Sequence, residues 1–433
     1  MQLKKILNSL LGTMILFSAI SVSAQENGLS AYSLYTFYGI GDIATQGPTY
    51  LRSMGGASVA FRSPNMLNYT NPAAYSAVAR NTFLFNVGLE QQNYYVKSAD
   101  KSTAFNTFNL RNIAFEFPVA AKMGVGISIA PYSDVGYRLS VEDTDPNVVG
   151  NIGNVNYRYY GEGGLSQIKA GFGWEIFNNF SIGAHLVFYR GYISRVFSTT
   201  INNITGVPYY YNASGEQNEE ISSLFGEFGI QYMMIDNTQT KFTIGATYHP
   251  GGKMHNKSYR YMPSSSMEND TLIYSTYNMG FELPTTWSVG LNFKKRRYML
   301  AADYEFKDWG KRNKDDVTEQ REFRDTNSFK VGGEYTPSAG DVRSFLKRLT
   351  YRAGFRYSDY YMRIYGQDIN EKVITLGVGI PMRNTNLSNL NLGVEMGQRG
   401  QTSHGLYKDT FVKFSVGMNF FGEDYWFVKF KYD

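Results

Sequence analysis

The chain has 433 residues, no cysteine and a formal net charge of +5. The lack of cysteine excludes disulfides, thiolate metal sites and a cysteine nucleophile, and so mild a charge does not indicate a nucleic-acid partner. Aromatic residues make up 16% of the chain and glycine occurs 43 times, a composition that favours an all-β protein.

Residues 1–24 are predicted to be a secretory signal peptide. Lys4 and Lys5 precede an apolar run, and small residues lead to a cleavage point before Gln25. No later run of about 18 apolar residues occurs, so no transmembrane helix is predicted. A secreted, strand-rich chain of this kind is a soluble sandwich or propeller, or an outer-membrane barrel.

Residues 39–75 are irregular in composition, being rich in Gly, Pro, Asn and Thr, the residues of turns. Apolar residues such as Ile40, Met54 and Leu67 interrupt them, so this stretch is not a solvated linker. We expect residues 25–80 to form a plug inside a barrel made by the rest of the chain. The alternative is an N-terminal arm lying on the periplasmic side.

The chain after residue 80 alternates apolar and polar residues with the period of β-strands. In residues 241–249, Phe242, Ile244 and Tyr248 share one face, and Lys241 and Thr243 lie on the other. A soluble sandwich would show the same alternation, but here the polar rows carry charges and many glycines, as expected for the polar interior of a membrane barrel. The charged positions are Lys169, Glu175, Glu227, Lys330, Glu334, Arg352, Arg356 and Glu395.

Connection lengths favour the membrane barrel. Short connections alternate with long polar segments, and outer-membrane barrels have short periplasmic turns and long extracellular loops. The long segments are residues 141–161, 198–218, 250–270 and 310–326. We therefore predict a transmembrane antiparallel β-barrel of about fourteen strands over residues 81–421, with the plug in its lumen.

The predicted strands start near Asn81, Ala104, Lys122, Glu162, Asn179, Glu219, Lys241, Gly280, Arg297, Ser328, Leu349, Lys372, Asn389 and Thr410. Residues 271–293 are interpreted as a loop and one strand, although Pro284 could divide two strands. Residues 422–433 are predicted to be a periplasmic tail, with a further strand as the alternative.

Short motifs in the irregular stretch resemble the N-terminal hatch of the FadL-type outer-membrane transporters. These motifs are Gly55-Gly56 followed by Ala60, and then Asn71-Pro72-Ala73. A later stretch, residues 283–309, is also similar to that family. The resemblance implies a hatch-filled barrel in the outer membrane that imports long-chain fatty acids or other hydrophobic compounds, although the family also includes a component of a protein-secretion system.

Pro131 lies in the third predicted strand, in an apolar row expected to face lipid that includes Val135 and Tyr137. Proline lacks an N–H group, and a closed barrel has no edge strand, so we expect a local break in pairing continued by Ser133 and Gly136. In the FadL-type family a kinked third strand opens the wall sideways, which implies a lateral opening at these residues. The alternative is a simple bulge with no passage.

Catalytic and metal-binding motifs are not recognised in the sequence. The four histidines fit no such motif, so no enzyme activity, cofactor or metal site is predicted. Asp303 and Glu305 share one strand face and are interpreted as lumen lining that pairs with Lys307 or nearby basic residues.

Three functional hypotheses follow. The first is an importer, whose partners are the outer-membrane lipid bilayer and a hydrophobic small-molecule ligand. The second is an interaction or secretion-associated barrel that binds another envelope protein, for example through the tail. The third is a diffusion porin or an enzyme. An apolar cavity between plug and wall would favour the first hypothesis, and a filled lumen would favour the second.

Overall fold

The structure, a computed structural model, describes residues 29, 31–98, 101–203, 212–261, 275–277, 281–312, 321–382 and 385–423. The predicted signal peptide and most of the predicted tail lie outside these residues. Gly422 and Glu423 belong to the last strand.

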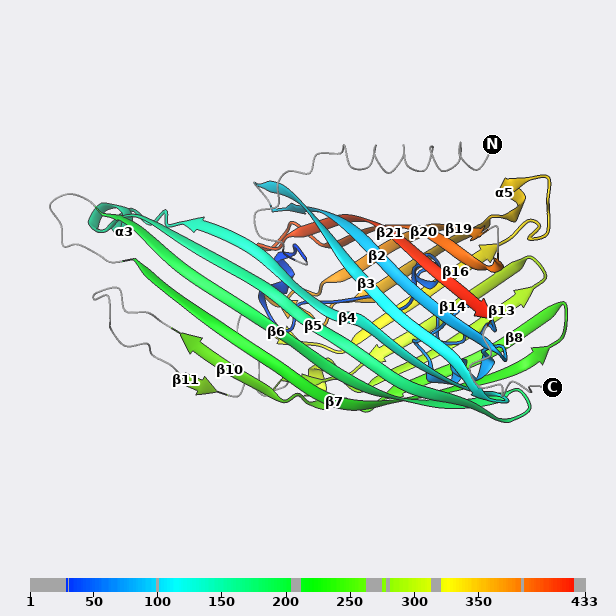
Figure 1. The fold of residues 1–433 in the computed structure, drawn as a ribbon. Helices are drawn as coiled ribbons and strands as arrows, with labels where there is room; N and C mark the ends of the chain where they lie inside the picture. The colour runs from blue at the N-terminus through cyan, green and yellow to red at the C-terminus, as the bar shows by residue number, and fades with distance from the viewer. Residues whose placement is uncertain are drawn as a thin grey trace.

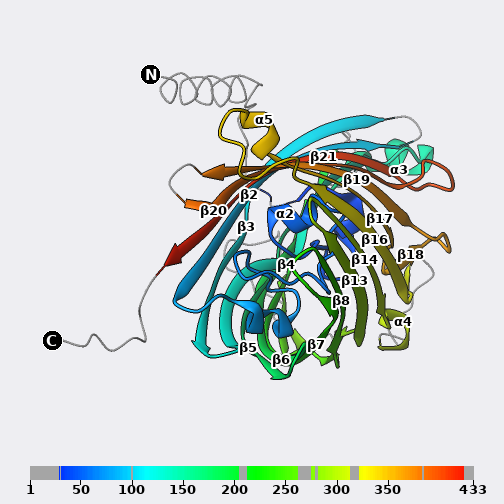
Figure 2. The ribbon, with the colours of Figure 1, turned by 90° about the vertical axis from the view of Figure 1, so that its right-hand side faces the viewer.

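Among the described residues, fourteen antiparallel strands form a closed barrel (Figures 1 and 2), because each strand pairs with the next and the last, β21, pairs with the first, β2. The first seven are β2 (Thr82–Lys97), β3 (Ser102–Ala120), β4 (Met123–Glu142), β5 (Gly153–Phe177), β6 (Phe180–Asn203), β7 (Ala213–Asp236) and β8 (Thr240–His249). The other seven are β13 (Thr286–Lys295), β14 (Tyr298–Lys307), β16 (Thr326–Tyr335), β17 (Thr350–Asp359), β19 (Asn370–Met382), β20 (Thr385–Gly400) and β21 (Lys408–Glu423).

Shorter elements complete the described chain. They are the strands β1 (Asp42–Ile43), β9 (Gly252–Lys253), β10 (Asn256–Tyr261), β11 (Ser275–Tyr277), β12 (Glu282–Leu283), β15 (Arg321–Phe323) and β18 (Met362–Ile364). The helices are η1 (Leu34–Phe37), α2 (Thr49–Arg52), η2 (Pro72–Ala77), α3 (Pro146–Asn151), α4 (Trp309–Arg312) and α5 (Phe345–Arg348). Among the described residues, no helix has the length and apolar character needed to cross a bilayer.

The prediction of a barrel of about fourteen antiparallel strands is confirmed. Most strands begin within three residues of the predicted start, and the single strand β13 follows Pro284. Two predicted loops are wrong in extent, because β5 starts at Gly153 and β6 runs to Asn203. Those stretches lie past the lipid-facing band and are rich in Asn, Arg, Ser and Thr, so their composition resembles that of a loop, yet backbone pairing continues.

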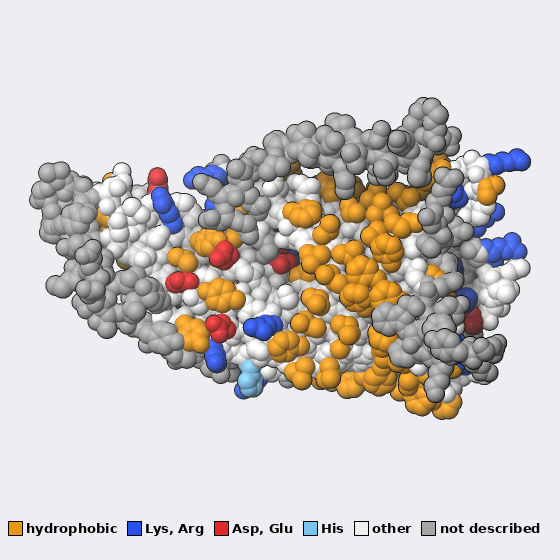
Figure 3. All heavy atoms as spheres, viewed as in Figure 1, with side chains coloured by type: hydrophobic (Ala, Val, Ile, Leu, Met, Phe, Trp, Pro, Cys, Tyr) orange, Lys and Arg blue, Asp and Glu red, His pale blue; other side chains and the backbone are white. Residues whose placement is uncertain are grey.

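Side chains sort to the two faces of the wall as the alternation requires. Ile127 and Leu291 point outward and are about half exposed, whereas Ser128 and Asn292 of the same strands are buried in the lumen. Figure 3 shows the outward apolar side chains gathered over one half of the barrel, toward the end with the short connections. This band is where the barrel contacts lipid, and β4–β7 extend past it at the other, outer end (Figure 1).

Residues 29–80, here called the N-terminal segment, run inside the ring of strands, where Figure 2 shows α2. Tyr50, Leu51, Met54 and Leu67 of this segment are almost completely buried. Apart from the short elements η1, β1, α2 and η2 its backbone is irregular, and the surrounding wall buries it.

Candidate functional site

The barrel wall is interrupted between its second and third strands. β3 and β4 pair from Ala120 and Met123 up to Ile113 and Ile129, and among the described residues no ladder joins them beyond that point. β3 nevertheless continues to pair with β2 as far as Ser102. β4 likewise continues along β5. We call the interval between residues 102–112 of β3 and 130–142 of β4 the seam.

A bulge in each strand marks the start of the seam. Arg111 is the extra residue of β3 where its register with β2 shifts. Tyr132 is the extra residue of β4, because Pro131 pairs with Ser166 of β5 and Ser133 with the adjacent Leu165. One inserted residue reverses which face the following side chains occupy.

The reversal corrects one prediction from the sequence. Ile127 and Ile129, before the bulge, are exposed on the lipid face. Val135 and Tyr137, after it, are 0% and 2% exposed and face inward, so the prediction that they face lipid is wrong. Alternation read through a bulge assigns every later residue to the wrong face.

The N-terminal segment covers the edge of β4 that β3 leaves unpaired. β1 pairs with β4, Asp42 opposite Asp134 and Ile43 opposite Ser133. Above and below this pair, the Ser33 N–H donates to the Gly136 carbonyl at 3.0 Å and the Gln46 side chain donates to the Pro131 carbonyl at 3.0 Å.

The three residues predicted for a lateral opening, Pro131, Ser133 and Gly136, thus lie together on the covered edge. At Gly136 a Cβ atom would fall 1.8 Å from the Ala31 carbonyl oxygen. Only glycine allows the segment to lie this close to β4.

The residues of the hatch-like motif fix the turns of the N-terminal segment. The Asn71 side chain accepts from the Ala73 N–H at 3.0 Å, caps η2, and donates to the Val59 carbonyl at 2.8 Å. Pro72 starts η2, and Ala60 is buried. Gly55 and Gly56 both have positive φ, where L side chains are strained.

Lumen-facing glycines of the strands make room for these residues. A Cβ atom at Gly332 would lie 2.3 Å from the Met54 carbonyl oxygen, and one at Gly183 would lie 2.4 Å from the Pro72 carbonyl carbon. The same holds for Gly124, Gly173, Gly229, Gly245, Gly354 and Gly377. The glycines on the lumen-facing side of the strands therefore provide the space in which the N-terminal segment packs against the wall.

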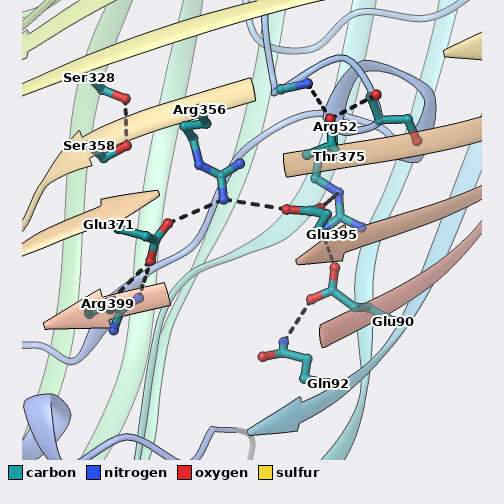
Figure 4. Close-up of polar contacts among 12 residues, drawn as sticks. Arg52, Glu90, Gln92, Ser328, Arg356, Ser358, Glu371, Thr375, Glu395 and Arg399 are labelled. Atoms are coloured by element: carbon teal, nitrogen blue, oxygen red, sulfur yellow. Dashed lines mark hydrogen bonds and ion pairs between the residues drawn. The ribbon is translucent and has the colours of Figure 1, made fainter. Parts of the chain in front are cut away.

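Buried ion pairs also connect the segment to the wall (Figure 4). Arg52 of α2 pairs with Glu90 of β2 and lies 3.8 Å from Glu395 of β20. Asp42 of β1 pairs with Arg399, which in turn binds Glu371 at 2.6 Å. Because an unpaired buried charge is costly, such pairs favour one position of the segment over others.

Asp303 has a different role from the one predicted. Its carboxylate accepts hydrogen bonds from the backbone N–H groups of Ser58 and Val59, at 2.6 and 2.9 Å. Glu305, on the same strand, pairs with Lys307 at 3.0 Å and Lys330 at 3.4 Å. Only Glu305 is thus the ion-paired lumen lining that the sequence suggested, and Asp303 holds the N-terminal segment.

The cavity at the outer end, here called the outer cavity, has a volume of about 460 Å³ and lies between the N-terminal segment and the extended parts of β4–β7. Aromatic side chains dominate one side: Phe37 packs on Tyr137 and Tyr159, with ring centroids 5.0 and 5.9 Å apart, and Phe197 lies nearby. Arg195 donates to the Phe37 carbonyl at 3.2 Å and pairs with Glu219 at 3.0 Å. Burial raises the pKa of the phenol of Tyr38, which also lines the cavity.

Two cavities deeper in the lumen are smaller, with volumes of about 120 and 110 Å³. Both are lined by Glu305, Lys307 and Lys330. They have room for a few water molecules and are charged, so the middle of the lumen is narrow, whereas a cavity of about 650 Å³ lies at the end with the short connections.

Histidine does not assemble into a reactive cluster here. His185 contacts the Tyr75 hydroxyl at 3.0 Å and Glu227 at 3.4 Å, which ties η2 to β6 and β7. Among the described residues, no group of three His, Asp or Glu side chains could hold a metal ion.

Sequence reasoning missed Arg111, Asp134, Asp42 and Arg399. One signal was available, since Asp134 lies in a strand that crosses the membrane and a carboxylate there needs a partner. The sequence does not show which residues form these pairs, because the partners lie far apart in the chain: Arg399 is 357 residues from Asp42.

The fourteen-stranded barrel with its N-terminal segment in the lumen has the fold of the FadL-type outer-membrane barrels. Similar solved structures include the Ralstonia pickettii toluene transporter TbuX (14% identity, TM-score 0.57, 87% of this chain and 98% of that chain covered). They also include a Pseudomonas aeruginosa FadL homologue (13%, 0.56, 89% and 100%) and the Pseudomonas putida toluene transporter TodX (15%, 0.54, 90% and 100%). At these identities the likeness shows the fold alone.

The family model that matches is BamG, over residues 3–433, so the chain belongs to the BamG family. No curated protein matches the chain. The FadL-type resemblance seen in the sequence is confirmed at the level of the fold.

Proposed function

We propose that this protein is an outer-membrane transporter of hydrophobic small molecules, and that it releases them sideways through the seam into the membrane. The observation that carries the proposal is the end of the β3–β4 ladder at Ile113 and Ile129, next to an edge of β4 that the N-terminal segment covers. Lateral release keeps the solute in an apolar setting, which is worth about 0.8 kcal/mol per buried CH₂.

The outer cavity supplies an entry point for such a solute. Its volume, about 460 Å³, falls in the range of roughly 300–1,000 Å³ typical of small-molecule sites, and its aromatic side suits an apolar ligand. Two of the structures that share the fold are named toluene transporters, and we propose the same broad class of solute here.

The N-terminal segment connects the cavity to the seam. Gly39 and Ile40 line the outer cavity, and Asp42 and Ile43 pair with β4. Gly41 is therefore the single residue between the part of the segment that lines the cavity and the part that covers the seam. Gly39 and Gly41 both have positive φ. We propose that a solute in the outer cavity displaces β1 from β4 and so uncovers the seam.

A disulfide across β1 and β4 tests this route. Ile43 and Ser133 are directly opposed, and opposed Cα atoms in antiparallel strands lie at about 4.5–5.5 Å, within disulfide range. The variant carrying Ile43→Cys and Ser133→Cys should lose uptake of labelled toluene and of a fluorescent fatty acid when oxidised, and regain it on reduction. The matched control is Thr243→Cys with Asn292→Cys, a pair in the intact β8–β13 ladder, which should transport in both states. Full uptake by the oxidised Ile43–Ser133 variant would rule out release through the seam.

A second candidate function is favoured by the narrow, charged middle of the lumen, with its cavities of about 120 and 110 Å³. In this alternative the barrel binds another envelope protein through β4–β7, which extend past the lipid-facing band. A photo-crosslinker at Tyr192, which is 42% exposed on β6, should then capture one defined envelope protein in cells. Capture that persists in the oxidised disulfide variant, with no uptake by the unmodified chain, would favour this function over transport.

A further inference from the structure

The connection between β16 and β17 presents apolar side chains to the outside. It contains α5 and lies at the end of the barrel with the short connections, which faces the periplasm in outer-membrane barrels (Figure 1). Val342 is 91% exposed, Leu346 65% and Phe345 44%. Three exposed apolar side chains within five residues indicate a surface that contacts something other than water.

The connection is bonded to the lipid-facing side of the wall. The Tyr351 hydroxyl, on the outer face of β17, donates to the Leu346 carbonyl at 3.0 Å. On the neighbouring strands β14 and β16, the outward rings of Tyr298 and Tyr335 stack with centroids 4.7 Å apart. Tyrosines at strand ends form the aromatic belt that marks the membrane–water interface. Figure 2 shows α5 outside the ring of strands, which agrees with this position.

The same end of the barrel is strongly basic. The β13–β14 turn reads Lys294-Lys295-Arg296-Arg297, and the connection itself carries Arg343, Lys347 and Arg348. Among the described residues no carboxylate lies within 4.0 Å of Lys294, Arg297 or Arg343. These cations are therefore available to an external anion.

One carboxylate, that of Asp341, shapes the connection. It accepts hydrogen bonds from the backbone N–H groups of Ser344 at 2.8 Å and Arg343 at 2.9 Å. These bonds hold the pKa of Asp341 below its usual value, so it stays ionised and keeps the turn before α5 ordered. The apolar side chains are thus presented in a fixed arrangement.

We propose that residues 338–348 are an interfacial membrane anchor, in which Val342, Phe345 and Leu346 enter the periplasmic leaflet. Lys294, Arg297 and Arg343 bind the phosphate groups of phospholipid head groups. Apolar side chains at the belt with cations beside them match the two parts of a phospholipid, since an interfacial segment combines apolar insertion with attraction to anionic lipid. The apolar patch is continuous with the lipid-facing wall through Tyr351, which favours lipid over a soluble partner.

The chain has no cysteine, so a single introduced thiol can report on this segment in the full-length barrel. An environment-sensitive fluorophore on Val342→Cys, in phospholipid nanodiscs, should emit at shorter wavelength than one on Thr238→Cys. Thr238 is exposed in the β7–β8 turn at the same end and serves as the matched control. Spin-labelled phospholipid should quench the Val342 probe severalfold more than the Thr238 probe, and aqueous iodide should do the reverse.

Equal quenching of both probes by iodide would overturn the proposal. Protection of the Val342 probe in native outer membranes but not in nanodiscs would also overturn it, in favour of a protein partner. A charge variant, Arg297→Glu with Arg343→Glu, should reduce the lipid quenching in anionic nanodiscs more than in zwitterionic ones. No reduction in either nanodisc would show that attraction of these cations to lipid phosphate has no part in the anchoring.

Discussion

Arg111 of β3 reaches across the seam to Asp134 of β4, with its Nη1 atom 3.3 Å from a carboxylate oxygen. The same guanidinium lies 3.5 Å from Glu90 of β2. These strands share no backbone ladder at this level, so a side-chain ion pair takes the place of main-chain hydrogen bonds. A side-chain contact can break and re-form without unzipping a sheet, which suits a wall that opens.

Removing this contact should weaken the barrel at the seam. Arg111→Ala leaves Glu90 and Asp134 buried with fewer cations, and breaking a buried pair in this way costs about 3–5 kcal/mol. We expect a lower temperature for heat-induced unfolding on semi-native gels. The control is Lys241→Ala, which removes a pair with Asp236 whose side chains are 53% and 34% exposed and should cost no more than about 1 kcal/mol. An unchanged Arg111→Ala transition would mean that the seam is held by the N-terminal segment alone.

Filling a lumen glycine should displace the N-terminal segment while the barrel still forms. Gly332→Val places side-chain atoms where the Met54 backbone lies 2.3 Å from the Cβ position. We expect new protease cleavage near Met54 in vesicles open to the periplasmic side, with normal heat-modifiable migration. Gly226→Ala is the control, because its Cβ would meet only the Phe228 ring at 3.6 Å. Equal protease resistance in both variants would contradict the seating role of the wall glycines.

Much of the barrel was predictable from alternation, and the reason is physical. In a strand such as residues 241–249, successive side chains point alternately to the lipid and to the lumen, so apolar and polar residues must alternate in the sequence. Prediction failed where that constraint is absent: β5 and β6 extend past the lipid, and both of their faces tolerate polar residues. It also failed after Tyr132, where one inserted residue reverses the faces of Val135 and Tyr137.

The candidate site was predictable only in part. Pro131 marked the break in pairing, because a residue without N–H is conspicuous in a closed barrel. The pairing of the N-terminal segment with the edge of β4 was not predicted, because Asp42 and Asp134 come together only when the barrel has formed around the N-terminal segment. The ion pair of Asp42 with Arg399 depends on the same closure, and no local pattern encodes it.

Trimming the outer cavity should weaken solute capture. Phe197→Ala removes apolar surface from the cavity lining, which we expect to cost about 1 kcal/mol of binding, or roughly fivefold in Kd. Initial uptake of labelled toluene at low concentration should fall by a similar factor and recover at saturation. Phe293→Ala, on the lipid face, is the control and should leave uptake unchanged. Equal uptake in the two variants would place solute entry elsewhere.

A substitution at Gly136 is the most direct way to displace the part of the N-terminal segment that covers the seam. Its Cβ position lies 1.8 Å from the Ala31 carbonyl oxygen, and its carbonyl accepts the Ser33 N–H at 3.0 Å. Gly136→Val therefore forces residues 31–36 away from β4, while the added β-branched side chain suits the strand itself.

If the cover regulates release, the Gly136→Val barrel should take up hydrophobic probes faster than the original chain and show ready thiol labelling of an added Ser33→Cys. The matched control is Gly150→Ala, since a Cβ atom at Gly150 meets nothing within 4 Å, and it should behave as the original chain. A Gly136→Val variant that folds, exposes residue 33 and still shows unchanged uptake would separate the cover from transport. The seam would then be a structural join between β3 and β4, and the function would have to be sought in the parts of β4–β7 that extend past the membrane.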